Sequence, residues 1–248
     1  MYGWRGRLGL IVPSTNTVNE PDFYRNLPPG VSLHVSRMYL DQESHREKEN
    51  LSELERMTEY IDRCATLLST AEIDVIAYGC TSGSFMEGTE HEREIEALLR
   101  EKAGAPAVTT SGAVRNALDA LDVTSLLIVS PYTDTVLERA RRYFQDCGFD
   151  IAGSDGLGID IVGSDLERRS HGAQIPQRSY RQTRALDHED VDGIFISCTN
   201  YHASDAIEYL EADLQKPVVT SNQATLWDSL RTIGVDYSDV ELGMLFDQ

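Results

Sequence analysis

Lysine is scarce in this sequence. Of its 22 basic residues only Lys48, Lys102 and Lys216 are lysines, and the rest are arginines. The 41 aspartates and glutamates outnumber these bases and give a formal net charge of −19 over 248 residues. A surface of this sign repels phosphates and anionic lipid headgroups, so we expect neither nucleic acid nor a membrane as a partner. A lysine-poor, acidic composition is also typical of halophilic proteins, with an ordinary acidic protein as the alternative.

Long hydrophobic runs are missing as well. The first apolar run extends from Leu8 to Val12 and is ended by Pro13. This run is too short for the core of a signal peptide or for a membrane-spanning helix. We therefore expect a cytoplasmic protein in which the run forms a buried strand.

Cysteine pairs of the CxxC type are absent. The four cysteines are scattered along the chain: Cys64, Cys80, Cys147 and Cys198. We expect reduced thiols and no metal, because no histidine stands at ligand spacing from a cysteine pair. The histidines that could join two cysteines as metal ligands are His91, His171 and His202. We interpret His202, four residues after Cys198, as solvated or as a supporting residue. Phosphate-binding glycine motifs, a G-x-S-x-G elbow and HExxH are also missing.

Short apolar runs alternate with amphipathic stretches along the chain. The strand candidates are 7–12, 31–40, 73–79, 106–109, 125–130, 149–153, 192–197 and 217–220. The clearest helix candidates are 51–69, 90–102, 134–146, 202–213 and 223–232. This alternation predicts an α/β fold in which helices cover both faces of a parallel sheet. The segment 153–177, rich in Gly, Ser, Asp and Arg, is a candidate loop or lid.

The two halves of the sequence resemble each other. Residues 7–18 align with 125–136 at an offset of 118, with five of twelve positions identical. The motif DVIAYGCT at 74–81 aligns with DGIFISCT at 192–199 at the same offset. A third pair, APAVTTSGA and KPVVTSNQA, follows at an offset of 111. Ordered matches at a nearly constant offset indicate a duplicated unit. The alternative is that any two strand–turn–helix units share small residues at the turn.

The duplication predicts two similar Rossmann-like lobes, each a parallel sheet flanked by helices, related by a pseudo-twofold axis. We assign residues 1–112 to the first lobe, with 222–248 packing back on it, and 113–221 to the second. Ligands of open parallel sheets bind beyond the carboxyl ends of the strands. Because Cys80 and Cys198 occupy matching places after a strand, we expect them to meet across one cleft.

These two cysteines are the strongest candidates for chemistry. Each follows an apolar strand, where a helix N-terminus would stabilise a thiolate and lower its pKa. Two such thiols on opposite faces of a carbon suit addition with protonation, and they suit two-base racemisation equally. Cys64 and Cys147 have no repeat partner, and we interpret both as structural. The alternative for all four is inert packing.

The loop after the first strand is a candidate carboxylate cradle. Residues 13–17, PSTNT, offer hydroxyls, an amide and backbone N–H groups, with Asn16 as the best donor. A plain helix cap is the alternative, since Ser, Thr and Asn all cap well. The matching second-lobe loop supplies Tyr132, either as a donor or as a packing residue. Asp134 stands in the place of Asn16, so we expect that second loop to act only as a helix cap.

Five segments together resemble maleate cis–trans isomerase and arylmalonate decarboxylase, in the aspartate/glutamate racemase superfamily. They are VPSTNT at 12–17, GCTSGS at 79–84, SPYT at 130–133, SCTN at 197–200 and PVVTSNQATLWDSLR at 217–231. The resemblance spans Arg7 to Arg231. It implies two Rossmann-like lobes with the active site between them, no cofactor, no metal, and a homodimer.

The resemblance also implies roles for individual residues. Cys80 would add to the double bond of maleate and Cys198 would protonate the neighbouring carbon, before rotation and elimination release fumarate. The small carboxylate substrate would be bound by Ser14, Asn16, Thr81, Ser82, Tyr132, Thr133, Thr199 and Asn200.

Two features bear on the choice within this family. The decarboxylases have glycine where Cys80 stands, so both cysteines together favour an isomerase or a racemase. Maleate isomerases carry a further substrate-binding Asn in the segment that resembles 157–164, which here reads LGIDIVGS and has no Asn. Either the second carboxylate is held differently or the substrate is not maleate. Because both cysteines are present, we expect a maleate isomerase, with an amino-acid or hydantoin racemase or an arylmalonate-type decarboxylase as the alternative. A ligand-binding protein without turnover is the alternative outside enzymes.

Overall fold

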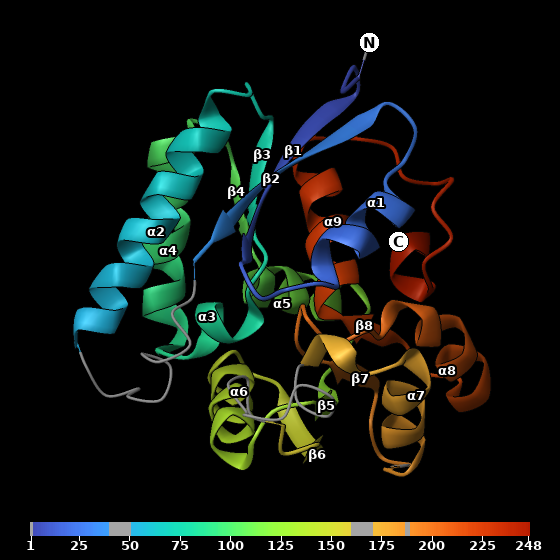
Figure 1. The fold of residues 1–248 in the computed structure, drawn as a ribbon. Coiled ribbons are helices and arrows are strands. Elements are labelled where there is room, and N and C mark those ends of the chain that lie inside the picture. Colours follow the sequence, from blue (N-terminus) through green and yellow to red (C-terminus); the bar gives the residue numbers. More distant parts are fainter. Residues whose placement is uncertain (1, 40–50, 160–170, 187–188) are drawn as a thin grey trace.

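Two four-stranded parallel sheets form the framework of the molecule (Figure 1). The computed structural model describes residues 2–39, 51–159, 171–186 and 189–248, with the backbone alone for 51–58. Part of the predicted loop or lid at 153–177 therefore lies outside the described residues. Its described parts hold the end of a strand, a turn of 3₁₀ helix at His171–Ala173 and the start of a helix.

The first sheet has the strand order β2-β1-β3-β4. Its strands are β1 (Gly6–Pro13), β2 (Val31–Met38), β3 (Val75–Tyr78) and β4 (Ala107–Thr109). All neighbours pair in parallel, with Leu8 opposite Val75 and Ile11 opposite Tyr78. The strands read as apolar runs because helices cover both faces of the sheet.

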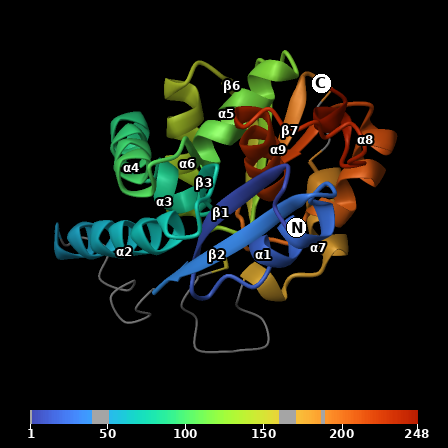
Figure 2. The same ribbon diagram turned by 90° about the horizontal axis from the view of Figure 1, so that it is seen from above.

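Helices cover the first sheet on both sides (Figure 1, Figure 2). They are α1 (Asn19–Asn26), α2 (Leu51–Ser69), α3 (Thr81–Phe85) and α4 (Gly88–Ala103). α2 and α4 pack together on one face, and α1 lies on the other. Alternation along the strands divides the core, since Ile11 and Ile76 join the cluster under α2 and α4 whereas Leu10 and Val75 join the other.

The second sheet repeats the first, with the order β6-β5-β7-β8. Its strands are β5 (Ser125–Ser130), β6 (Asp150–Gly156), β7 (Gly193–Ile196) and β8 (Val218–Thr220). Its helices are α6 (Asp134–Asp146), α7 (Pro176–Arg184) and α8 (Ile207–Leu214). The identical strand order confirms the predicted fold of two similar parallel α/β lobes.

Two further helices, α5 (Thr110–Ala120) and α9 (Ser221–Thr232), join the lobes. Each follows the last strand of its lobe and begins at a threonine N-cap, Thr109 or Thr220, that accepts a backbone N–H. The two helices pack against each other, α5 also against β8 and α9 also against β3, β4 and α1. Each lobe thus sends its last helix to the boundary with the other.

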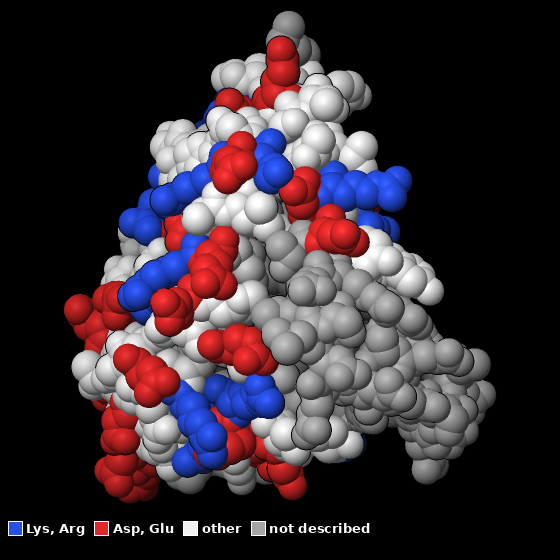
Figure 3. All heavy atoms as spheres, turned by 90° about the vertical axis from the view of Figure 1, so that its left-hand side faces the viewer, with Lys and Arg blue, Asp and Glu red and all other residues white. Residues whose placement is uncertain are grey.

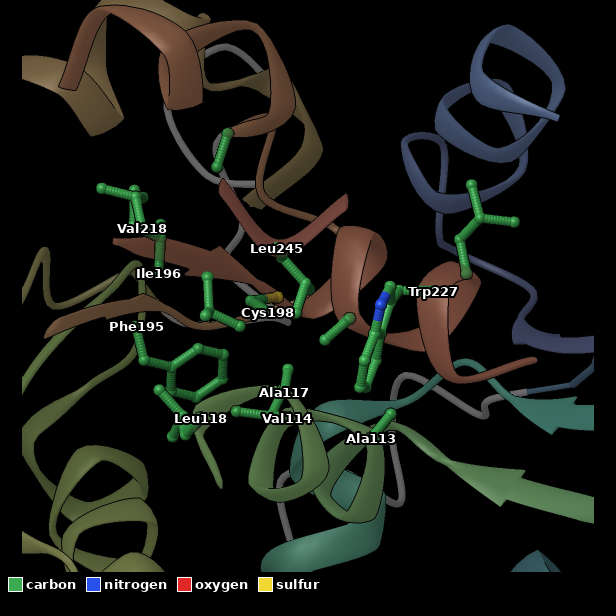
Figure 4. Packing of buried hydrophobic residues seen from close by; sticks show 14 of the residues in the cluster. Ala113, Val114, Ala117, Leu118, Phe195, Ile196, Cys198, Val218, Trp227 and Leu245 are labelled. Atoms are coloured by element: carbon green, nitrogen blue, oxygen red, sulfur yellow. The ribbon is translucent and has the colours of Figure 1, made fainter. Parts of the chain in front are cut away.

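The core between the lobes is filled by small and branched side chains. On α5, Leu118 lies next to Phe195 of the second sheet, and Ala113 lies next to Trp227 of α9 (Figure 4). Small residues on α5 let the helix approach the sheet closely. The lobe boundaries at 112/113 and 221/222 stay predictions.

The outer surface mixes charges of both signs. Over the face formed by α2, α4 and α6, acidic side chains intermingle with arginines (Figure 3). Arg139 pairs with Glu87 at 3.2 Å, and Arg142 with Glu138 at 3.0 Å. Such exposed pairs contribute little stability. Among the described residues, no helix has the length and apolarity needed to cross a membrane.

Candidate active site

Cys80 and Cys198 follow the carboxyl ends of the two central strands β3 and β7. Both side chains are buried, with 8% and 9% of their surface exposed. The negative charge of an ionised Cys80 is among the causes that raise the pKa of Cys198. Both cysteines also act on Tyr132. Burial is the largest cause that raises the pKa of its phenol, and the charges of ionised Cys198 and Cys80 raise it further. The two thiols are therefore buried and close enough for the charge of one to act on the other.

Cys80 is held at the start of the short helix α3. Its backbone is extended, with φ −144°, and it occupies the N-cap position. Its carbonyl accepts bonds from the backbone N–H and the hydroxyl of Ser84, at 3.1 Å each. α3 is only five residues long, so its dipole at the thiol is weaker than that of a full helix.

Tyr78 lies beside Cys80, and the sequence reasoning did not single it out. It is fully buried, and burial followed by the charge of Cys80 raises the pKa of its phenol. Both groups face Gly83: a Cβ at that position would overlap the Tyr78 Oη and would lie 2.9 Å from the Cys80 Sγ. Glycine is therefore required here to leave space for the nucleophilic candidate.

Cys198 has an unusual backbone for a residue other than glycine, with φ +93°. Its N–H donates to the Ser221 hydroxyl at 3.0 Å, and its carbonyl accepts the N–H of Tyr201 at 3.0 Å. The helix predicted over 202–213 begins later than expected, so Cys198 does not lie at its N-terminus. The chain makes a turn instead, and α8 begins only at Ile207. The reason is that the residues after Cys198 bond across to the first lobe.

The prediction of a lowered pKa is also wrong for Cys198. Burial, the largest cause, raises the pKa of this thiol from 9.0 to about 12. The backbone N–H of Asn200 and the Tyr132 hydroxyl bond to the sulfur and offset the shift in part. Cys198 is accordingly a neutral thiol at neutral pH, which suits a proton donor.

A buried chain of hydrogen bonds links the lobes behind the thiols. Asn16 Nδ2 donates to Thr199 Oγ1 at 3.0 Å, and that hydroxyl donates to the Gly79 carbonyl at 3.1 Å. The Thr199 N–H donates to Thr81 Oγ1 at 3.2 Å, and Thr81 donates to Ser221 Oγ at 3.0 Å. Thr81 and Thr199 are repeat partners, so the duplication brings both to the boundary.

Asn16 holds the backbone at the start of α1 and also donates a hydrogen bond at the boundary between the lobes. Its Oδ1 accepts the N–H groups of Val18 and Asn19, at 3.0 and 2.9 Å, and so holds the start of α1. An amide has two N–H donors, and one of them serves Thr199. The second meets no acceptor among the described residues and is available to a ligand. Both the predicted cap and the predicted donor role are compatible with this geometry.

Arg37 anchors the Asn16 loop and was missed by the sequence reasoning. Its Nη1 donates to the carbonyls of Asn16 and Ser14, at 2.9 and 3.3 Å. Its Nη2 pairs with Glu20 at 2.8 Å. The guanidinium therefore fixes the backbone of the loop from β2.

The remaining predicted contacts differ in their surroundings. Ser14 is half-buried and its N–H donates to Met38 at 2.7 Å. Ser82 is half-buried within α3. Asn200 Oδ1 accepts the N–H of Thr17 at 2.9 Å. Thr133 occupies the N-cap position of α6 but its side chain makes no capping bond.

The second-lobe loop precedes a helix, but the prediction that it acts only as a cap is wrong, because no side chain caps α6 and Tyr132 bonds to Cys198. α6 begins at Asp134, whose charge is favourable in the first turn. Tyr132 is 1% exposed, accepts a bond from Ser197 at 3.4 Å and packs edge-on against Phe85. Burial raises the pKa of its phenol, so the group remains an O–H donor.

His171 is the residue that the sequence reasoning placed least well. It was considered only as a further metal ligand, but its Nδ1 lies 3.3 Å from Cys198 Sγ. Its Nε2 lies 3.0 Å from the carbonyl oxygen of Ile159. That carbonyl belongs to the segment in which the family's second-lobe Asn is missing; residues 160–164 of the segment lie outside the described residues. No spacing in the sequence signals this contact.

His202 lies near the surface beside an aspartate. The His202 side chain is 29% exposed and lies 3.0 Å from Asp205, which fits a partly solvated residue. In the part of the chain that is described, no group of three or more His, Cys, Asp or Glu side chains is placed to hold a metal ion.

The arrangement combines two thiols, a phenol, an amide and several hydroxyls in one buried place. Thiols are nucleophiles and proton carriers, and the neutral donors suit a carboxylate. The site therefore fits addition to, or proton exchange at, a carbon next to a carboxylate.

Comparisons with known proteins agree with this geometry. A family model described as arylmalonate decarboxylase matches residues 8–246. A maleate isomerase of Pseudomonas putida is 29% identical over 243 residues, 93% of this chain and 92% of that protein. Arylmalonate decarboxylase of Bordetella bronchiseptica is 33% identical over 160 residues, 64% of this chain and 65% of that protein. A Pseudomonas putida maleate isomerase variant solved with maleate superposes with a TM-score of 0.84 and 26% identity over 97% of both chains. The chain therefore belongs to the family of arylmalonate decarboxylase and maleate isomerase.

Proposed function

We propose that this protein is a cofactor-independent cis–trans isomerase that converts maleate to fumarate. The observation that carries the proposal is the pair of buried cysteines, one from each lobe, in a single site. Maleate isomerases of Pseudomonas putida and Geobacillus stearothermophilus, 29% and 27% identical, support the substrate. A related structure from Pseudomonas putida was solved with maleate.

The reaction begins with addition. The Cys80 thiolate attacks one alkene carbon, an S–C bond forms, and the π electrons move to the neighbouring carbon, where the adjacent carboxylate delocalises them. The Cys198 thiol transfers its proton to that carbon. The product of this half-reaction is a succinyl thioether on Cys80 and a thiolate on Cys198.

The second half reverses the first after a rotation. The former double bond is now a single bond, so the two carboxylates turn from the same side to opposite sides. The Cys198 thiolate takes a proton back from carbon, the double bond re-forms, and the S–C bond breaks. Fumarate leaves, and both cysteines return to their starting states without any external reactant.

The electrostatics of Cys198 support its role as the acid. Cys198 keeps its proton at neutral pH because burial raises its pKa to about 12. It is thus prepared to act as the acid. Cys80 occupies the matching position in the first lobe, after β3, and acts as the nucleophile.

Neutral donors hold the substrate in this proposal. Asn16 and Tyr132 each provide a buried donor, and hydroxyls or N–H groups of Ser14, Thr81, Ser82, Thr133, Thr199 and Asn200 line the surrounding loops. Donors that are fixed by the fold need little reorganisation when charge develops on the carboxylate.

The test is to follow maleate and fumarate by NMR with purified protein. Cys80→Ala and Cys198→Ala should abolish turnover, whereas Cys147→Ala should retain it, because Cys147 stands at the C-cap of α6 and its thiol bonds to Arg115 and Tyr143. Turnover by Cys80→Ala would contradict the mechanism.

A second candidate is decarboxylation of a substituted malonate. It is favoured by the arylmalonate decarboxylase family model and by the 33% identity to the Bordetella enzyme. Release of carbon dioxide from phenylmalonate would support it. Deuterium entering the α-carbon of a chiral amino acid or hydantoin in heavy water would support the racemase alternative instead.

The homodimer, the cytoplasmic location and the adaptation to high salt belong to this proposal too. The charge of −19 supports the last of these. Sedimentation at several salt concentrations would measure the oligomeric state.

A further inference from the structure

A buried histidine lies against the proposed acid. His171 stands in the short 3₁₀ turn between β6 and α7, and 4% of its surface is exposed. Its Nδ1 lies 3.3 Å from the Cys198 Sγ, within hydrogen-bond distance for sulfur. The addition and elimination steps above make no use of this residue.

The tautomer of His171 follows from its second contact. Nε2 lies 3.0 Å from the backbone carbonyl oxygen of Ile159. A carbonyl oxygen only accepts, so Nε2 carries a hydrogen. In the neutral ring Nδ1 is then the acceptor, and the Cys198 S–H is the donor in the contact.

The position of the ring is fixed from several sides. The Tyr132 ring packs edge-on against it, with centroids 5.6 Å apart. At Gly172, the next residue, a Cβ would lie 2.6 Å from Asn200 Oδ1 and 2.5 Å from Thr17 Oγ1. Glycine therefore allows the 171–173 turn to approach the loop after Cys198, and the histidine is brought to the thiol by packing.

Among the described residues, further titratable groups around this pair come from three places. Tyr132, after β5, bonds to Cys198 and packs edge-on against His171. Cys80, after β3, and Tyr201, after β7, both interact electrostatically with Cys198. Burial raises the pKa of both tyrosines, so at neutral pH they are uncharged and His171 is the neighbour able to accept a proton.

We propose that His171 is the proton partner of Cys198, a positioning residue that holds the thiol proton on the Sγ–Nδ1 line and accepts it reversibly. The proton moves from Sγ to Nδ1 and leaves a thiolate beside an imidazolium, while Nε2–H stays on Ile159. The pair keeps its total charge, and return of the proton restores the neutral thiol. The role within turnover rests on the proposed isomerase, whereas the pairing itself does not.

Two substitutions separate the two ring nitrogens. His171→Asn keeps a hydrogen-bonding atom near the place of Nδ1, and His171→Gln keeps one near the place of Nε2, but neither ionises. For both we expect kcat to fall about 100-fold, the lower end of what a positioned proton-transfer group contributes. We expect KM to change little, and the pH profile of kcat to lose the ionisation of the pair.

Two kinetic outcomes would overturn the proposal. Full activity in His171→Asn would show that a hydrogen bond alone is sufficient. A raised KM with unchanged kcat and pH profile would make His171 a substrate contact instead.

A labelling experiment tests the pairing without turnover. The rate of iodoacetamide addition to Cys198 is measured against pH by mass spectrometry, with Cys64 in the same molecule as the control. Because His171 accepts the proton of Cys198, we expect labelling of Cys198 to begin at a lower pH in the natural protein than in His171→Asn or His171→Gln. The same pH dependence of labelling in the natural protein and in the variants would show that the pairing is wrong.

The two proposals fail in different ways. Absence of maleate turnover together with His171-dependent labelling would refute the isomerase and keep the pair. Maleate turnover with an unchanged pH profile in both variants would refute the pair and keep the isomerase.

Discussion

Gly83 offers a sharp test of how the first thiol is positioned. In Gly83→Ala the new methyl group would overlap the Tyr78 Oη and lie 2.9 Å from Cys80 Sγ, where ordinary contacts begin at 3.4 Å. The Tyr78 ring is fully buried and has no free direction in which to move. The thiol of Cys80 therefore takes much of the displacement, by about 0.5–1 Å.

The stability and the activity should respond differently. Alanine is a better helix former than glycine by about 1 kcal/mol, whereas overpacking costs about 1–3 kcal/mol. The free energy of unfolding should thus fall by no more than about 2 kcal/mol. A misplacement of about 1 Å at a reacting group lowers the rate about 100-fold, so kcat should fall by that order while the protein stays folded.

The assay is maleate turnover together with urea unfolding, for Gly83→Ala, Tyr78→Phe and the double variant. Removal of the Tyr78 hydroxyl makes room for the methyl group, so the double variant should recover part of the lost stability, a positive coupling between the two sites. Normal kcat in Gly83→Ala, or strictly additive effects in the double variant, would refute this account of the space around Cys80.

Three further results are expected. Ser221→Ala should lower the unfolding free energy by about 1–3 kcal/mol, because the Cys198 N–H and the Thr81 hydroxyl lose a buried partner; Ser229→Ala, on the same helix, bonds only within it and should cost less. Urea unfolding should show stability that is constant below pH 9.0 and falls towards pH 12, because the folded state holds the Cys198 proton more tightly than the unfolded chain does; a curve that is unchanged in Cys198→Ala would exclude this cause. Added KCl should lower KM for maleate, because screening weakens the repulsion between a dianion and a protein of charge −19; a KM that rises with salt would indicate local attraction instead.

The fold was largely predictable because its signals are local. All eight strand candidates correspond to strands, since buried parallel strands are apolar runs bounded by turns. The short helices α1, α3 and α7 lay outside the clearest candidates, because each has fewer than ten residues and little periodicity. α5 was also omitted, since its small residues serve packing between the lobes more than an amphipathic pattern.

The candidate site was predictable in its members but not in its chemistry. The duplication pointed to Cys80, Cys198, Thr81 and Thr199, and the structure brings them to one boundary. The helix predicted over 202–213 begins only at Ile207, because Thr199 and Asn200 bond across the lobes and the chain makes a turn after Cys198. Bonds to the other lobe leave no trace in local sequence.

By itself, the sequence determined the duplicated α/β unit and the placing of one cysteine after a matching strand of each lobe. Both features can be recognised from short segments, namely the apolar runs and the motifs that recur at an offset of 118 residues. Only the tertiary structure decided the protonation of Cys198 and its partners. Ser221 and His171 stand 23 and 27 residues away along the chain. Burial sets the pKa of the thiol, and burial is a property of the packed lobes, because it depends on which segments exclude water from the sulfur.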